Sequence, residues 1–213
     1  MVYCLGPQNK KGVFLLKHIL FVDCCLRGAQ SRTRKLAQAF LESCLRLNPG
    51  VKTTIVDLDK EKPVPTDSRM LAKRDSLMAQ WEDPFFAPAR QFLDADLIVL
   101  AAPFWNGSFP ALLHSYLEQI CVPDLTFTCV GEDYTGLSQA KACVLITTRG
   151  GCYEHGSMLG PEHATPLVRS IMKMLGINRV ETLAAEGIDL VEDPSPIIAE
   201  ACRKAESLAE ALS

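Results

Sequence analysis

The sequence lacks several features that would point to a membrane, a nucleic acid or a redox dithiol. No apolar run approaches the roughly 20 residues that a membrane-spanning helix needs. The charge is nearly balanced, with 22 basic and 25 acidic residues, so there is no general basic field for nucleic acid. No cysteines stand in a C-x-x-C spacing, which argues against a thioredoxin-type pair and a zinc knuckle. These absences predict that the protein binds neither nucleic acid nor membrane.

Cysteine itself is abundant, because the chain contains nine. Their scatter through apolar segments predicts free thiols in a reducing, cytoplasmic compartment. The four histidines share no metal-ligand spacing with these cysteines, so no metal is expected. Cys24 and Cys25 are adjacent, and a redox-sensing disulfide between them is an alternative that the strain of such a bridge disfavours.

Length and composition predict one folded domain. Hydrophobic residues make up 48% of the 213 residues and charged residues 22%, the balance of a globular protein. The first 17 residues hold Lys10, Lys11 and Lys17 beside an apolar stretch, 13–16, that is too short for the core of a signal peptide. We therefore expect an N-terminal extension over residues 1–17 and a single domain over 18–213.

Short apolar runs alternate with amphipathic stretches along that domain. Loops are expected at 60–67 and, as a long irregular excursion, at 122–137. Strands separated by helices, without tandem hairpin patterns, predict an α/β fold with a parallel sheet covered on both faces. The predicted strands are 18–22, 51–58, 96–102, 140–148 and 179–185; the predicted helices are 68–80, 109–121, 166–175 (ended by Gly176), 196–212 and one between 31–33 and 48–50.

The loop after the first strand is a candidate anion site, because ligands of such sheets bind beyond the carboxyl ends of the strands. Here Ser31, Arg32 and Thr33 stand at a predicted helix start, where unpaired N–H groups and the helix dipole favour an anion. The pattern predicts a phosphate site, although a serine-capped helix with a basic surface would look the same. Four cations add to it: Arg27, Arg32, Arg34 and Lys35.

The same loop excludes other phosphate-binding classes. Gly28 is its only glycine, so the G-x-G-x-x-G dinucleotide motif is missing, and no G-K-[ST] indicates a P-loop. The spacing from Cys25 to Arg32 is one residue too long for a low-molecular-weight tyrosine phosphatase.

An aromatic turn follows the strand 96–102, with the residues Pro103, Phe104, Trp105, Asn106 and Gly107. Aromatic rings beyond a buried strand are costly to leave exposed unless something planar covers them. Flat apolar walls suit a flavin, and the amides around Asn106 and Gly107 can meet its polar edge. A hydrophobic plug that packs the next loop is the structural alternative.

A glycine pair follows the strand 140–148, in the segment Thr148, Arg149, Gly150 and Gly151. Adjacent glycines let the backbone approach a ligand closely, and Arg149 brings a cation beside them. A plain turn explains one glycine more easily than two. The three loops together predict a site with an anion cradle, an aromatic wall and a glycine-lined floor.

With these motifs the chain resembles the FMN-dependent NADH-azoreductase and NADH:quinone oxidoreductase family, relatives of flavodoxin. The resemblance runs over residues 17–212. It is carried by A-P-F-W-N with F-P-A-L-L-H-S-Y-L-E, by T-T-R-G-G, and by the later L-G-I and A-E-G-I segments. It implies a flavodoxin-like three-layer sandwich with strand order 2-1-3-4-5, a homodimer, bound FMN, and NADH or NADPH as electron donor.

The resemblance also implies roles for individual residues. The segment 31–33 would hold the FMN phosphate, the turn 104–107 would line the isoalloxazine ring, and 148–151 would contact its polar edge. Cys25 stands where relatives commonly carry a serine, and Tyr153 where they often carry a histidine, so both are candidate site residues.

The implied activity is two-electron reduction of quinones or aromatic azo compounds by a ping-pong cycle, with the hard chemistry supplied by the flavin. No dedicated catalytic side chain is expected, although Arg149 or the Gly150 and Gly151 amides would stabilise negative charge on the reduced flavin. A flavodoxin-type electron carrier is the main alternative; carriers are usually more acidic than the net charge of −3 found here. A flavin-free interaction protein would leave the wall formed by Phe104 and Trp105 without a purpose.

Overall fold

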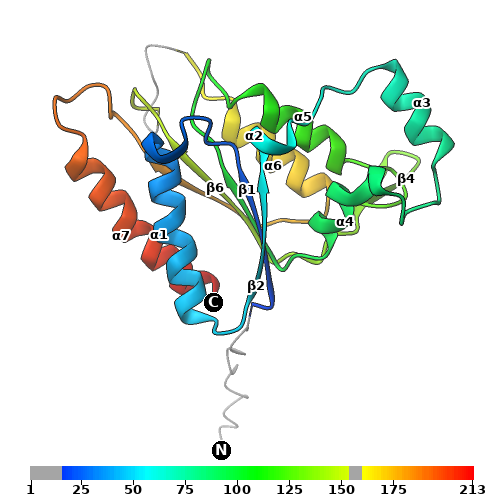
Figure 1. Ribbon diagram of the computed structural model, residues 1–213, viewed down its shortest axis with the longest axis horizontal. Helices are drawn as coiled ribbons and strands as arrows, with labels where there is room; N and C mark the ends of the chain where they lie inside the picture. Colours follow the sequence, from blue (N-terminus) through cyan, green and yellow to red (C-terminus); the bar gives the residue numbers. More distant parts are fainter. Residues whose placement is uncertain (1–15, 154–159) are drawn as a thin grey trace, which may run out of the picture.

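A five-stranded parallel sheet forms the centre of the molecule (Figure 1). The computed structural model describes residues 16–153 and 160–213. The strand order β2-β1-β3-β6-β7 equals the predicted order 2-1-3-4-5 once a separate hairpin is set aside, so the predicted fold is confirmed. The strands are β1 (His18–Asp23), β2 (Lys52–Asp57), β3 (Leu97–Ala101), β6 (Ala142–Thr148) and β7 (Val180–Ala185).

Burial explains why the short apolar runs form strands. Every residue of β1, β3 and β6 is buried, as expected for central parallel strands that are covered on both faces. β1 lies between two neighbours in parallel register, with Ile19 opposite Thr53 of β2 and Leu97 of β3. β2 lies at the sheet edge and is mostly exposed or half-buried, which fits its mixed sequence.

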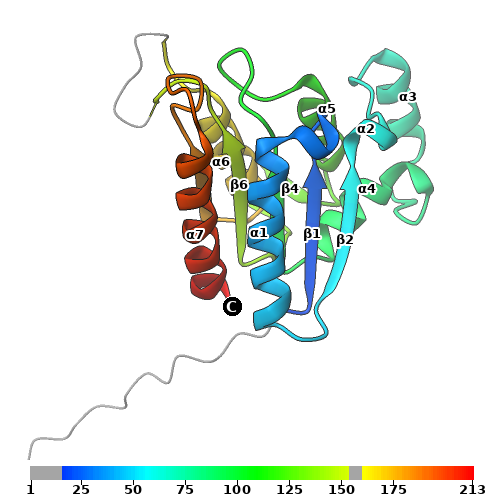
Figure 2. The ribbon, with the colours of Figure 1, turned by 60° about the vertical axis from the view of Figure 1, so that its left-hand side comes forward.

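Two long helices, α1 (Arg32–Leu47) and α7 (Ser195–Leu212), cover one face of the sheet (Figures 1 and 2). The α1 side chains Leu36 and Phe40 are fully buried in a core with Ile19 and Phe21 of β1. The amphipathic pattern that predicted the first helix is therefore the stripe that packs on the sheet.

The opposite face is covered by α5 (Ala111–Ile120) and α6 (Ala164–Met174), with α4 (Ala87–Leu93) beside α5. Leu20 and Val22, which alternate with the β1 residues of the first core, belong to this second core. α6 ends as predicted, because Gly176 has a φ of 101° and the N–H of Ile177 donates to the carbonyl of Met172 at 2.8 Å.

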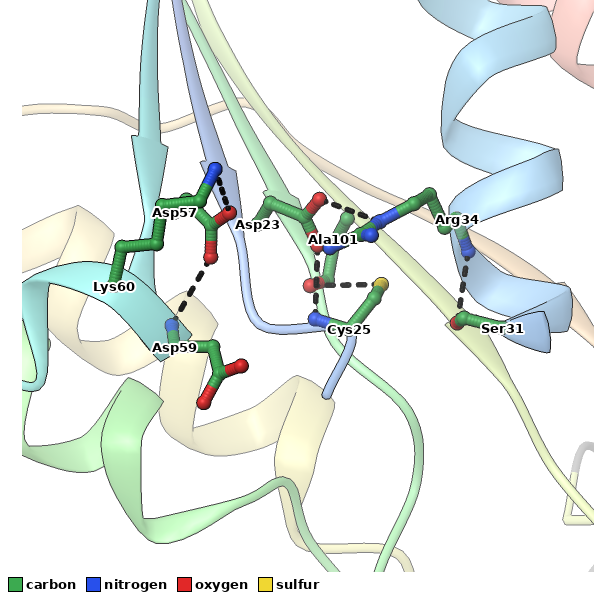
Figure 3. Close-up of polar contacts among 8 residues, drawn as sticks. All are labelled: Asp23, Cys25, Ser31, Arg34, Asp57, Asp59, Lys60 and Ala101. Atoms are coloured by element: carbon green, nitrogen blue, oxygen red, sulfur yellow. Dashed lines mark hydrogen bonds and ion pairs between the residues drawn. The ribbon is translucent and has the colours of Figure 1, made fainter. Parts of the chain in front are cut away.

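The predicted loop 60–67 contains regular structure at its start. A short helix, α2 (Leu58–Glu61), overlaps the start of 60–67, and the Asp57 carboxylate caps it by accepting the Asp59 N–H at 3.1 Å (Figure 3). The helix predicted over 68–80 is α3 (Ser68–Ser76), which begins where predicted and ends earlier. Short 3-10 turns lie at η1 (Gly28–Gln30) and η2 (Pro84–Phe86).

The expectation that 122–137 is irregular is wrong in part. This stretch contains an antiparallel hairpin of β4 (Phe127–Val130) and β5 (Asp133–Gly136). Both strands are short and partly exposed, and their sequences, FTCV and DYTG, carry no clear apolar alternation that would have marked them. The missed signal is Gly131, which has a φ of 65° at the first position of a tight two-residue turn.

The first residues that the structure describes, Leu16 and Lys17, are hydrogen-bonded to the rest of the fold. Residues 1–15 of the predicted extension lie outside the described residues. Leu16 is buried and donates its N–H to Asn48 Oδ1 at 3.1 Å, and the Lys17 N–H donates to Asp96 Oδ2 at 2.9 Å. Among the helices of the described ranges, none has the length and apolar character needed to cross a membrane.

Candidate functional site

A cleft of about 360 Å³ lies at the carboxyl edge of the sheet, where the loops after β1, β3, β6 and β7 converge. Its volume is in the range of pockets that hold small-molecule ligands, about 300–1,000 Å³. Eight predicted site residues line it: Ser31, Arg32, Thr33, Pro103, Phe104, Trp105, Thr148 and Gly150. Five further residues line it: Arg27, which the sequence predicted as a cation of the first loop, and Leu26, Gln30, Ile188 and Asp189, which were not predicted.

The first turn of α1 forms the polar end of this cleft. Ser31 caps the helix, and its Oγ accepts the N–H of Arg34 at 3.2 Å. The N–H groups of Arg32 and Thr33 belong to the first turn, where no carbonyl of the same helix can accept them. Arg32 and Thr33 both line the cleft, so this turn presents donors to an anion.

A buried hydroxyl pair joins the first loop to the third. Thr33 Oγ1 lies 2.7 Å from Thr148 Oγ1, and both side chains are almost fully buried. This hydrogen bond fixes the start of α1 against the end of β6 and closes the floor of the cleft between them.

Two of the four cations predicted in the first loop, Arg32 and Arg34, form ion pairs with carboxylates. Arg34 Nε lies 2.8 Å from Asp23 Oδ2, and the other carboxylate oxygen of Asp23 accepts the Cys25 N–H at 2.8 Å (Figure 3). Arg32 Nη1 lies 3.2 Å from Asp189 Oδ1 across the mouth of the cleft. Arg34 therefore stabilises the loop, whereas Arg32 remains half-exposed beside the cleft.

The aromatic turn owes its shape to Asn106 and Gly107. Trp105 and Ser108 exchange backbone hydrogen bonds of 2.9 and 2.8 Å, and Asn106 and Gly107 both have positive φ, 52° and 78°. These are the features of a type I′ turn, for which Asn-Gly is the preferred sequence. Asn106 and Gly107 do not line the cleft. They shape the turn that holds Trp105, which is 37% exposed and lines the cleft.

The glycine segment approaches the cleft by its backbone. Gly150 lines it, and a Cβ at Gly150 would collide with the Asp189 carboxylate, so only glycine leaves Asp189 in place. Gly151 and Tyr153 do not line the cleft, although the Tyr153 ring packs on Phe104 with centroids 4.6 Å apart.

The Arg149 side chain does not line the cleft and is buried in a cluster with two carboxylates. Its Nη1 lies 2.7 Å from Glu186 Oε1, and its Nη2 lies 3.6 Å from Glu162 Oε1 and 3.1 Å from Thr165 Oγ1. The guanidinium also lies 5.3 Å from the centre of the Phe104 ring. The carboxylates offset the charge of Arg149. A direct role of Arg149 in stabilising negative charge on a bound ligand stays a prediction.

The cysteines of the first loop are buried rather than presented to the cleft. Cys25 is 2% exposed and its Sγ donates to the Ala101 carbonyl at 3.7 Å (Figure 3). Burial raises the pKa of Cys24 to about 12, and burial together with the neighbouring Asp23 carboxylate raises the pKa of Cys25. All eight cysteines of residues 16–153 and 160–213 are free thiols, and these ranges contain no cluster able to hold a metal.

The lining residues that sequence reasoning missed could have been predicted from their positions after the strands. Ile188 and Asp189 come directly after the last strand, which ends at the same edge as the others. The rule that placed the other loops at the site applies equally to this one. Leu26 and Gln30 belong to the first loop itself, beside the predicted cation Arg27.

Known proteins share this fold and much of this sequence. A family model described as a flavodoxin-like fold matches residues 17–209. FMN-dependent NADH:quinone oxidoreductase 2 of Clostridium acetobutylicum is 35% identical over 182 residues, which cover 84% of this chain and 91% of that protein. FMN-dependent NADH:quinone oxidoreductase 1 of Xanthomonas axonopodis pv. citri is 31% identical over 171 residues, which cover 80% and 85% of the two chains.

Solved structures agree with this assignment. An azoreductase from Bacillus anthracis str. Sterne superposes with a TM-score of 0.82 at 29% identity and covers 91% of this chain and 98% of its own. The sheet order, the cleft beyond its carboxyl edge and these relatives lead to one conclusion: the chain belongs to the flavodoxin-like family of FMN-dependent NADH:quinone oxidoreductases and azoreductases.

Proposed function

We propose that this protein is an FMN-dependent NAD(P)H oxidoreductase that reduces quinones or aromatic azo compounds. The observation that carries the proposal is the joining, in one cleft, of a helix N-terminus with an aromatic and glycine-lined wall. An anion site alone would fit many phosphorylated ligands, and an aromatic wall alone many planar ones. The combination fits a flavin mononucleotide, as the names of the relatives also indicate.

The residues at the polar end would hold the phosphate. Ser31 shapes the first turn of α1, and the backbone N–H groups of Arg32 and Thr33 would donate to the phosphate oxygens. The Arg32 guanidinium adds charge and is free to leave Asp189, because exposed ion pairs are weak, about 0.2–1 kcal/mol.

The apolar end would orient the ring. Pro103, Phe104 and Trp105 line one part of the cleft, and the Gly150 backbone, which also lines it, would meet the polar edge of the ring. FMN supplies the two-electron chemistry when it is bound, so none of these side chains has to act as a nucleophile. The chain's own work is to bind, orient and keep water from the reacting face.

Assembly and location complete the proposal. We expect a homodimer, and the exposed apolar side chains of the β4–β5 hairpin, Val130 (79% exposed) and Tyr134 (60% exposed), favour a covered surface. Light scattering on a sizing column tests this expectation, since a monomer mass would contradict it. Free thiols throughout the described ranges favour the cytoplasm, which cell fractionation tests.

The visible absorption spectrum tests the function. The purified protein is supplied with FMN, freed of excess cofactor and mixed anaerobically with NADH and then, separately, with NADPH. A bound-flavin spectrum that bleaches with either donor and recovers on adding a quinone or azo dye is the expected result. Bound flavin that stays oxidised with both donors would favour an electron carrier, and the absence of bound flavin would refute the proposal.

A further inference from the structure

A second hollow adjoins the cleft that is proposed to hold the flavin. It has a volume of about 560 Å³, and two of its lining residues, Leu26 and Trp105, also line the cleft. The rest of its lining comes from within 106–112, at the end of the aromatic turn and the start of α5, and from His114. The two spaces therefore meet at Leu26 and Trp105, and a molecule that extends out of the cleft past these side chains enters the hollow.

The size of the cleft leaves little room for an acceptor beside a bound flavin. Its volume of about 360 Å³ lies near the lower end of the range of small-molecule pockets, about 300–1,000 Å³. FMN carries three fused rings, a ribityl chain and a phosphate, so it would fill most of such a space. An acceptor with more than one ring then needs adjoining space for the part that does not contact the flavin, and the hollow provides it.

Trp105 offers a planar ligand a surface at the junction of the two spaces. Its side chain is 37% exposed and lines both of them. The backbone hydrogen bonds between Trp105 and Ser108 hold this residue in a tight turn. Stacked aromatic pairs are stabilised beyond the area that they bury, so a partly exposed indole in a rigid turn favours an aromatic ligand.

Ser108 and His114 add two hydrogen-bonding side chains to the hollow. Ser108 Oγ lies 3.5 Å from His114 Nε2, at the long limit of a hydrogen bond, so this contact is weak. Within the described ranges neither side chain has another hydrogen-bond partner. The His114 ring packs on the buried Phe109, with ring centres 4.3 Å apart, which holds it in place. Both groups are therefore available to an oxygen atom of a ligand.

The charge of the hollow suits a negative substituent. None of the described residues that line it is acidic, so an anion placed there meets no carboxylate of the lining. Hydrogen bonds to an ionised acceptor are roughly twice as strong as those between neutral groups. A carboxylate or sulfonate is therefore the substituent that the hydroxyl and ring N–H donors of this hollow would bind best.

We propose that the hollow binds the distal ring of an extended aromatic acceptor, and that His114 and Ser108 donate hydrogen bonds to a carboxylate or sulfonate on that ring. The distal ring would stack on Trp105, and the group that is reduced would lie in the cleft. Acid-substituted azo compounds and quinones with two or more rings are then the preferred acceptors, ahead of single-ring ones. The inference rests on the proposed function, because it takes the cleft to hold FMN.

Calorimetric titration of the FMN-loaded protein with trans-stilbene-4-carboxylate tests the inference. This probe has the shape of an azobenzene but no azo group to be reduced, so it measures binding without turnover. His114→Phe keeps a ring against Phe109 and removes the N–H donor. The expected result is a rise in the Kd of the carboxylate of about tenfold or more. The neutral carboxamide of the same probe should bind the unchanged protein more weakly and lose less affinity in this variant.

Two further variants control for the shape of the site. His114→Gln keeps a side-chain N–H and should retain most of the affinity for the carboxylate. His163→Gln is the matched control, because His163 is exposed and its backbone N–H donates to the Gly107 carbonyl of the same aromatic turn, yet it does not line the hollow. This variant should bind both probes as the unchanged protein does. Flavin absorbance, recorded for every variant, reports separately whether FMN is bound.

Each outcome decides between the two claims. An FMN-loaded His114→Phe variant that loses no affinity, or loses it equally for the carboxylate and the carboxamide, overturns the inference and leaves the proposed function standing. If His114→Phe does not fold, Ser108→Ala removes the other donor, and an unchanged affinity for the carboxylate in that variant overturns the inference equally. An unchanged protein that holds FMN but does not bind the carboxylate also overturns it. An unchanged protein that binds no FMN overturns the proposed function, and the inference with it.

Discussion

Replacing Arg32 with alanine should weaken the binding of FMN without weakening the binding of riboflavin. Riboflavin carries the same ring and ribityl chain but no phosphate, so it reports on the aromatic wall alone. Arg32 lines the cleft at the first turn of α1, where the phosphate is proposed to bind. Its removal takes away a charged donor and leaves Phe104 and Trp105 in place.

The magnitude follows from the contacts of Arg32. A hydrogen bond to a charged group contributes about 1.5–3 kcal/mol, from which the lost pair with Asp189, exposed and about 0.2–1 kcal/mol, must be subtracted. The net loss of about 0.5–2.8 kcal/mol corresponds to a rise in Kd of about 2- to 100-fold. Asp189→Asn should act in the opposite direction, by about 1.5- to 5-fold, because it frees Arg32 and removes a negative charge from the mouth of the cleft.

Quenching of flavin fluorescence during titration with the protein measures both affinities. Arg46→Ala is the matched control, because Arg46 is exposed at the far end of the same helix. Higher salt should reduce the difference between FMN and riboflavin in the unchanged protein, since the interaction is partly exposed. The reasoning would be refuted if Arg32→Ala weakened FMN and riboflavin by the same factor, or neither of them.

Three further outcomes can be measured. Thr33→Val should lower the free energy of unfolding in urea by about 1–3 kcal/mol, because it leaves the buried Thr148 hydroxyl without its hydrogen-bond partner. The double variant with Thr148→Val should lose less free energy of unfolding than the sum of the two single variants. Gly107→Ala should cost about 1 kcal/mol, since its φ of 78° strains any side chain; an unchanged unfolding midpoint would contradict the type I′ turn. Iodoacetamide at pH 8 should label exposed Cys152 and spare Cys24, whose pKa burial raises to about 12; mass spectrometry showing the reverse order would contradict that burial.

Much of the fold was predictable because its strands are buried on both faces. The run 96–102 has no polar residue after Asp96, and β3 inside it is completely buried. The β4–β5 hairpin escaped prediction because its strands are short, partly exposed and carry no clear apolar alternation. The tight turn of Asn106 and Gly107 was predictable from their sequence alone, yet it was interpreted as a ligand contact.

The site was predictable in position but not in its internal pairing. The carboxyl edge of a parallel sheet places the three loops together, whatever their sequences. No local pattern reveals that Arg32 pairs with Asp189 or that Arg149 pairs with Glu186, because these partners lie far apart in the chain. The charge of a site depends on such pairs, so four cations in one loop overstated its basic character.

A crystal structure of the protein with bound FMN tests the central claim most directly. We predict that the phosphate contacts the backbone N–H groups of Arg32 and Thr33, and that the ring lies in the cleft against Phe104, Trp105 and Gly150. An FMN molecule found elsewhere, such as the groove lined by residues within 66–74, 84–88 and 118–122, would contradict the account.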